Sequence, residues 1–254
     1  MKIHLRDIAY GRLLAPDLDI AEQFLLNFGM LRAARTETAL YMRGYGKDHH
    51  LHVTEKGPAG IASLALSVDS MVDLENATKI PGASAIEEIN EPGGGLRVRL
   101  TEPNGICIEL VYGIESVAPI AAPVHAMNTI HSPLNRPSGM TVMQRNPSHV
   151  HRIGHGVIAT PDIAQTTRWF GEHLGLLISD SIYVGQQDNI VGNFMRMDQG
   201  AQMVDHHTIL VASAPVAGLH HLSFEVSDID DVLRGHEVMQ AAGHTHLWGV
   251  SRHV

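Results

Sequence analysis

Two stretches of the chain share one pattern of hydrophobic and polar positions. Residues 8–17 form a short strand-like run that ends in Pro-Asp and leads into an amphipathic segment. Residues 153–162 repeat this order. Both stretches predict a strand, a break and a helix, with Asp17 and Asp162 as capping or first-turn acids.

A second pair of stretches is also alike. Residues 59–68 and 217–226 each form an apolar, strand-like run followed by a helical pattern. Alternating strand-like runs come after the helices of the first pair and of the second pair. They include residues 38–42, 96–100 and 106–111. The chain therefore contains four copies of one unit, a strand, a helix and about three strands, and such repetition is a signal at the level of the fold.

These copies predict an α+β fold of paired βαβββ modules in two domains. Modules one and two fill residues 1–115, a proline-rich linker or arm follows at 116–150, and modules three and four fill 151–254. The fourth module is incomplete and stops at Val254, in what should be its second strand. We expect a truncation there rather than a degenerate natural protein, because a break inside a strand unit leaves open backbone groups.

Composition narrows the class of protein. The 254 residues are 44% hydrophobic and carry a formal net charge of -9, which argues against nucleic acid or an anionic membrane as a partner. No apolar run is long enough for a membrane span, and charged residues stand where a signal peptide would be apolar. Cys107 is the single cysteine, so we expect a cytoplasmic protein without an internal disulfide. The 18 histidines direct attention to metal and proton chemistry.

Two histidines occupy equivalent places in the repeat. Strand alternation puts His221, Ser223 and Glu225 on one face, which should line a concavity, and the apolar residues between them on the other. His155 begins the equivalent strand of module three and is aimed at the same concavity. Two imidazoles with a carboxylate and open positions suit non-haem Fe(II). The alternative is a structural role for His155 and an exposed pair at His220 and His221.

The two histidine segments, residues 154–157 and 219–226, resemble those of the type I extradiol dioxygenases. This family belongs to the vicinal oxygen chelate superfamily, which also holds glyoxalase I and bleomycin-resistance proteins. The resemblance extends over nearly the whole chain. It implies one metal in the second domain, Fe(II) with Mn(II) as the alternative, bound by His155, His221 and a glutamate.

Two more segments resemble the dioxygenases rather than the rest of the superfamily. His206 and His207 match the family's acid–base histidine strand, and the sequence leaves open which of them points inward. His253 matches the family's second active-site histidine, which hydrogen-bonds the bound catecholate. The alternative for His206 and His207 is an exposed polar strand end.

The internal alignment supplies a control within the chain. His155 corresponds to Tyr10 and His221 to Ser63, so the first domain lacks the metal site and is predicted to be non-catalytic. Its last strand nevertheless places Glu109 on the concave face. The step from Ser63 to Glu109, taken from His221, passes the end of the chain. The third ligand is therefore expected to be a glutamate beyond Val254.

The implied function is Fe(II)-dependent extradiol cleavage of a catechol-type aromatic by dioxygen. By the resemblance the partners are a small aromatic substrate and dioxygen, and the protein is a homo-oligomer. Two alternatives stay open on the same fold: a glyoxalase-like metal lyase or isomerase, and a non-catalytic protein that binds a small aromatic or a drug.

Overall fold

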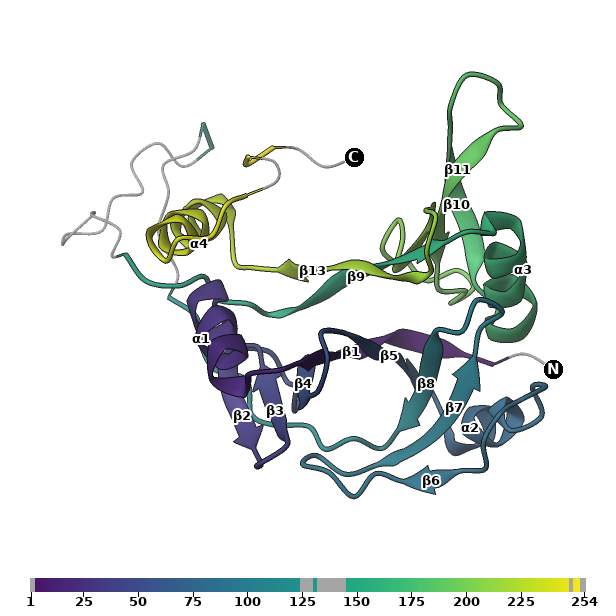
Figure 1. The fold of residues 1–254 in the computed structure, drawn as a ribbon, viewed down its shortest axis with the longest axis horizontal. Coiled ribbons are helices and arrows are strands. Elements are labelled where there is room, and N and C mark those ends of the chain that lie inside the picture. Colours follow the sequence, from purple (N-terminus) through teal and green to yellow (C-terminus); the bar gives the residue numbers. More distant parts are fainter. Residues whose placement is uncertain (1–2, 124–129, 132–144, 247–248, 252–254) are drawn as a thin grey trace.

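The computed structural model describes residues 3–123, 130–131, 145–246 and 249–251, which form two β-sheets with helices against them (Figure 1). The first half consists of β1 (Leu5–Ala15), α1 (Leu18–Phe28), β2 (Leu31–Arg35), β3 (Ala39–Arg43), β4 (His52–Lys56), β5 (Gly60–Val68), α2 (Met71–Ala77), β6 (Glu87–Glu88), β7 (Leu96–Thr101) and β8 (Cys107–Tyr112). The second half consists of β9 (Arg152–Thr160), α3 (Ile163–Leu174), β10 (Leu177–Tyr183), β11 (Ile190–Arg196), β12 (Ile209–Ser213), β13 (Gly218–Glu225) and α4 (Ile229–Ala241).

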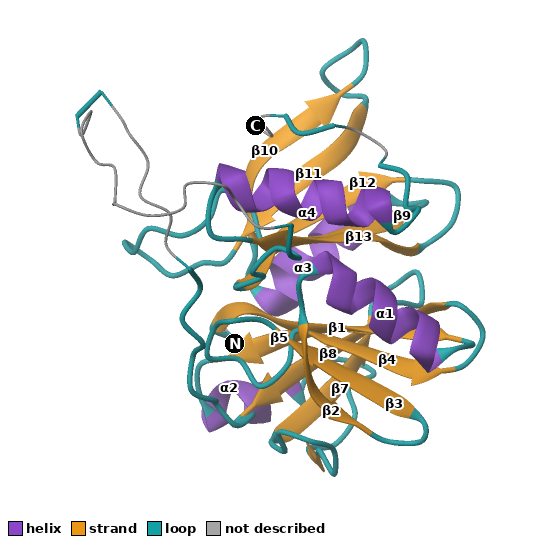
Figure 2. Ribbon diagram, turned by 90° about the vertical axis from the view of Figure 1, so that its left-hand side faces the viewer, coloured by secondary structure: helices purple, strands orange, loops and turns teal. Residues whose placement is uncertain are grey.

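The element order confirms the predicted α+β fold. Three complete βαβββ modules begin at β1, β5 and β9, and the fourth is described through β13 and α4. The first sheet has the order β2-β3-β4-β1-β5-β8-β7-β6 and the second the order β10-β11-β12-β9-β13. In two perpendicular views the second sheet lies over the first (Figure 1, Figure 2). The limits predicted for the domains and the arm remain predictions.

Strand register confirms the internal alignment residue by residue. In the antiparallel pair β1–β5, Tyr10 lies opposite Ala65 and Arg12 opposite Ser63. In the pair β9–β13, the equivalent partners are His155 with Ser223 and Val157 with His221. Because a slip of one residue would turn every side chain to the other face, equal register means that equivalent residues share a face.

The predicted helix ends are also found. At the helix N-termini, Asp17 accepts hydrogen bonds from two backbone amides of the first turn and Asp162 from one. Gly29 and Gly175 end the same two helices with φ angles of 111° and 71°, in the left-handed region that glycine adopts without strain. The Pro-Asp breaks and these glycines therefore fix both helices locally.

One polar contact occurs in both halves. The backbone N–H of His4 donates to Asp73 Oδ1 over 2.9 Å, and His4 Nδ1 lies 3.0 Å from the same oxygen. His149 and Asp231 repeat this pairing, with a backbone N–H bond of 2.8 Å and a ring contact of 2.9 Å. In each half the pair ties the segment before the first strand to the helix after the fifth.

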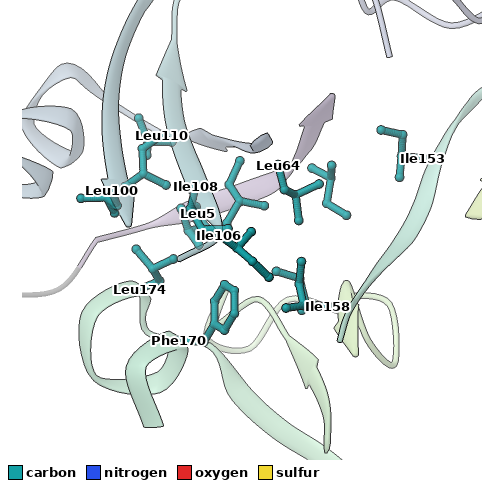
Figure 3. Packing of buried hydrophobic residues seen from close by; sticks show 14 of the residues in the cluster. Leu5, Leu64, Leu100, Ile106, Ile108, Leu110, Ile153, Ile158, Phe170 and Leu174 are labelled. Atoms are coloured by element: carbon teal, nitrogen blue, oxygen red, sulfur yellow. The ribbon is translucent and has the colours of Figure 1, made fainter. Parts of the chain in front are cut away.

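The hydrophobic core is continuous between the two halves. Figure 3 shows Phe170 and Ile158 of the second half in one cluster with Ile106 and Leu64 of the first. The apolar face of β13 is part of this core. A Cβ on Gly11 would lie only 2.3 Å from Leu222 Cδ1, so β1 needs a residue without a side chain at that point. The core therefore holds β9 and β13 firmly against the first half.

Within the described part of the chain, none of the helices is both long and apolar enough to cross a bilayer.

Candidate metal centre

His155 was expected to begin its strand, but it is the fourth residue of β9, because the strand already starts at Arg152. It lies on the face that turns away from the first half. Its neighbour Gly156 faces the other way, where an added Cβ would lie 3.4 Å from both Ile8 Cδ1 and Leu222 Cδ2. Side chains alternate along a strand, so packing at Gly156 directs the His155 imidazole to the opposite face. The core thus positions the first predicted ligand.

His221 lies on β13, beside β9. Its register partner is Val157, two residues from His155 and on the same face. The Nε2 atoms of His155 and His221 are 3.3 Å apart, and the ring centroids are 5.4 Å apart at 71°. The structure therefore brings the two predicted ligands together.

The other nitrogen of His221 also has a neighbour. His220 Nδ1 lies 2.8 Å from His221 Nδ1. A contact at one ring nitrogen fixes the orientation of the other, as is usual for histidines that bind metals. His220, which the sequence offered only as half of a pair, therefore orients His221 so that Nε2 is directed at His155.

His206 and His207 have different surroundings in the structure. The His207 ring lies 4.6 Å from that of His155 and 4.7 Å from Phe194, measured between centroids. His206 is exposed and contacts Phe194 at 5.5 Å. Of the two histidines, His207 is the one placed beside a predicted ligand, whereas His253 lies outside the described residues.

His155, His206 and His207 line an open cleft of about 330 Å³. Strands β9 and β13 form its floor, and the loop between β11 and β12 forms one wall. The lining residues are Arg152, Gly154, His155, Asp205, His206, His207, Ser223, Phe224 and Glu225. The cleft is therefore open on one side and rich in imidazole and carboxylate groups.

The donor set fits two of the ligands of a divalent metal. Two nitrogens that bind one ion at about 2.1 Å and at a right angle lie about 3 Å apart, close to the observed 3.3 Å. No group of three potential ligands is present among the described residues. His155 and His221 can thus hold a metal only with ligands from elsewhere.

The first half has different residues at the positions equivalent to His155 and His221. Glu109 lies on β8, which pairs in parallel with β5. Tyr10 Oη donates to Glu109 Oε2 over 2.6 Å, and Ser63 Oγ donates to Glu109 Oε1 over 2.7 Å. Tyr10 and Ser63 are the counterparts of His155 and His221, and the predicted position of Glu109 on the concave face is confirmed.

The sequence interpretation missed both cations at this place. Arg97 Nη1 lies 3.5 Å from Glu109 Oε2. The other cation is the more deeply buried Arg12. Its Nε lies 3.6 Å from Glu109, while Nη1 and Nη2 bind Glu55 at 2.5 Å and Glu91 at 2.7 Å. Burial alone lowers the pKa of Arg12, but Tyr10 and Glu109 outweigh it and hold this pKa above its ordinary value. Burial and Glu109 raise the pKa of Tyr10, so the phenol is neutral. The signal was present, since strand alternation puts Arg12 on the same face as Tyr10.

A comparison of sequences relates the chain to known proteins. Residues 152–254 match the family model of the Glyoxalase/Bleomycin resistance protein/Dioxygenase superfamily. The chain is 24% identical over 254 residues to metapyrocatechase 2 of Cupriavidus necator, and this alignment covers 98% of the chain and 74% of the relative.

Solved structures share the fold. The 2,3-dioxygenase LapB of Pseudomonas sp. KL28 superposes with a TM-score of 0.76 at 21% identity, covering 100% of this chain and 86% of that one. The Mn(II)-bound glyoxalase of Novosphingobium aromaticivorans gives a TM-score of 0.74 at 19% identity, covering 95% and 72%. Both similarities cover at least 95% of this chain and concern the fold. The part of the chain that carries His155 and His221, residues 152–254, is a domain of the Glyoxalase/Bleomycin resistance protein/Dioxygenase superfamily.

Proposed function

We propose that this protein opens the ring of a catechol-type aromatic with dioxygen, at a divalent iron held by His155 and His221. The observation that carries the proposal is the 3.3 Å approach of the two Nε2 atoms, with His207 against His155. The names of sequence relatives support it: metapyrocatechase 2 and biphenyl-2,3-diol 1,2-dioxygenase, the latter 27% identical over 147 residues.

The third ligand in this proposal is a glutamate outside the described residues. The first half supports a glutamate, because Glu109 on β8 meets both Tyr10 and Ser63. A strand parallel to β13, in the register of β8 on β5, would bring a carboxylate to His155 and His221. The proposal therefore takes the first half as a template for the second.

Bound Fe(II), or Mn(II) as the alternative, would lower the pKa of a catechol hydroxyl and supply an electron to dioxygen. His207 would accept the hydroxyl proton through a ring nitrogen, with exposed His206 as the second candidate. Phe194 packs on His207 and limits its movement. His253 would hydrogen-bond a substrate oxygen.

The test is oxygen consumption by full-length protein loaded with Fe(II) under anaerobic conditions. The panel contains catechol, 3-methylcatechol, 2,3-dihydroxybiphenyl and 3,4-dihydroxyphenylacetate. We expect one dioxygen to be consumed per ring opened with at least one of them. Absence of uptake with all four, while iron is demonstrably bound, would contradict the proposal.

A metal lyase or isomerase is the second candidate, favoured by the similarity to the Mn(II)-bound glyoxalase structure. The variants His206→Ala and His207→Ala separate the two functions. A lyase that relies on the metal and its ligands keeps its activity, whereas the proposed dioxygenase loses its proton acceptor.

A further inference from the structure

Arg152 is the first residue of β9 and lines the cleft, three positions before His155. Its guanidinium is surrounded by three carboxylates from three segments. Nε binds Glu225 at the end of β13, Nη1 binds Asp205 Oδ2 at 2.8 Å, and Nη1 lies 3.6 Å from Asp7 Oδ2 of β1. One side chain thus links both strands that carry the predicted ligands, the adjacent loop and the first half.

The loop between β11 and β12 carries the two candidate acid–base histidines. Residues 203–207 lie outside helix and strand, and Met203 is fully exposed. Regular backbone bonding resumes at Thr208, whose N–H donates to the Met195 carbonyl over 2.8 Å. The ion pair of Asp205 with Arg152 therefore ties the loop to β9 just before His206 and His207.

The geometry suits arginine in particular. The planar guanidinium presents separate N–H groups, here used on Glu225 and Asp205 at once. A lysine ammonium could not keep both bonds in the same directions. Positioning at this level matters for catalysis, since a displacement of about 1 Å can cost on the order of 100-fold in rate.

We propose that Arg152 is a positioning residue: its ion pair with Asp205 holds the His206–His207 segment over His155. The kinetic part of this inference rests on the proposed ring cleavage, whereas the structural part does not. The two parts are therefore tested by separate measurements.

The structural measurement is hydrogen exchange of the peptide spanning residues 203–208. In Arg152→Gln and in Asp205→Asn, we expect its exchange to quicken about 10-fold, and no further in the double variant, because both changes remove one interaction. Glu225→Gln removes the other bond of Arg152 and should leave this peptide unchanged. Arg145→Gln, which loses an exposed 3.9 Å pair with Glu237, is the matched surface control.

The kinetic measurement compares kcat and KM for oxygen uptake with a catechol. Arg152→Gln and Asp205→Asn should lower kcat about 10- to 100-fold while KM and iron content stay near the wild-type values, because the metal ligands are untouched. Arg152→Lys should restore part of kcat.

Unchanged exchange in both single variants, or additive effects in the double variant, would overturn the assignment of Arg152. Asp205 is half exposed on a loop, so Asp205→Asn provides the test even if Arg152→Gln does not fold. If iron-loaded wild-type protein consumes no oxygen, the proposed reaction fails, and hydrogen exchange still decides the role of Arg152.

Discussion

The two halves of this protein place different chemistry at equivalent positions. In the first half, Tyr10 and Ser63 converge on Glu109, and Arg12 and Arg97 supply the positive charge. In the second, His155 and His221 converge on each other. Strand register is the same in both.

The same strand framework carries a buried polar network in the first half and the proposed metal ligands in the second. Tyr10 and Glu109 are only 1% and 3% exposed. The carboxylates of Glu55, Glu91 and Glu109 all pair with Arg12. Such a closed network suits a structural role. In the second half His155 lines an open cleft together with His206 and His207.

The largest effect is expected from the two proposed ligands. His155→Ala and His221→Ala should each abolish iron binding and reduce oxygen uptake to background, a greater loss than the roughly 10- to 100-fold seen when a hydrogen-bonding neighbour of a ligand is removed. Tyr10→Phe and Ser63→Ala, at the equivalent first-half positions, should retain iron. Metal analysis after gel filtration measures the iron content of both sets of variants. Iron retained by His155→Ala or His221→Ala would contradict the difference proposed between the two halves.

The proton acceptor should have the next largest effect. We expect His207→Ala to lower kcat by about 100-fold or more at unchanged iron content, because general acid–base groups contribute on the order of 10²- to 10⁴-fold. His206→Ala, at the exposed neighbour, is the matched variant and should lose less. Steady-state oxygen uptake ranks the two, and the reverse ranking would transfer the role to His206.

Glu109 should matter for stability and not for metal. Glu109→Gln leaves buried Arg12 and its neighbour Arg97 with one carboxylate fewer, which should lower the free energy of unfolding by about 3 kcal/mol. Glu88→Gln, an exposed change on β6, is the control. Urea unfolding gives the difference, and loss of iron from Glu109→Gln would show that the first half takes part in metal binding.

The smallest effect concerns pH and two buried histidines of the first half. Burial lowers the pKa of His50 to about 3 and that of His52 to about 4. Both stay neutral in the folded protein while the unfolded chain takes up protons below its ordinary histidine pKa of about 6.5. Their contribution is therefore fully present above pH 6.5 and is lost as the pH falls toward 4.

We expect each histidine to reduce stability by about 1.2 kcal/mol between pH 7 and pH 5.5. His52→Gln should remove about half of the combined loss from the two histidines. Urea unfolding of both proteins at the two pH values measures it. Equal losses in wild type and variant would mean that His52 does not stay neutral in the fold.

The framework could be predicted from the sequence because each copy of the repeat has the same short-range sequence features. Pro-Asp breaks, helix-ending glycines and alternating strands recur at matching places, and they determined the modules and the faces of His155 and His221. The inward direction of His207 could not be predicted, because its loop is held by the long-range contact between Asp205 and Arg152. Strand alternation indicated the face of Arg12, but its network was missed because its partners Glu55 and Glu91 are distant in sequence.

The central claim is that metal binds in the second half and not at its first-half counterpart. Diffraction from crystals of the Fe(II)-loaded, full-length protein, recorded at the iron absorption edge, tests this most directly. The account predicts one anomalous peak per chain, about 2 Å from the Nε2 atoms of His155 and His221. A peak beside Glu109, or iron bound with no peak near His155, would contradict it.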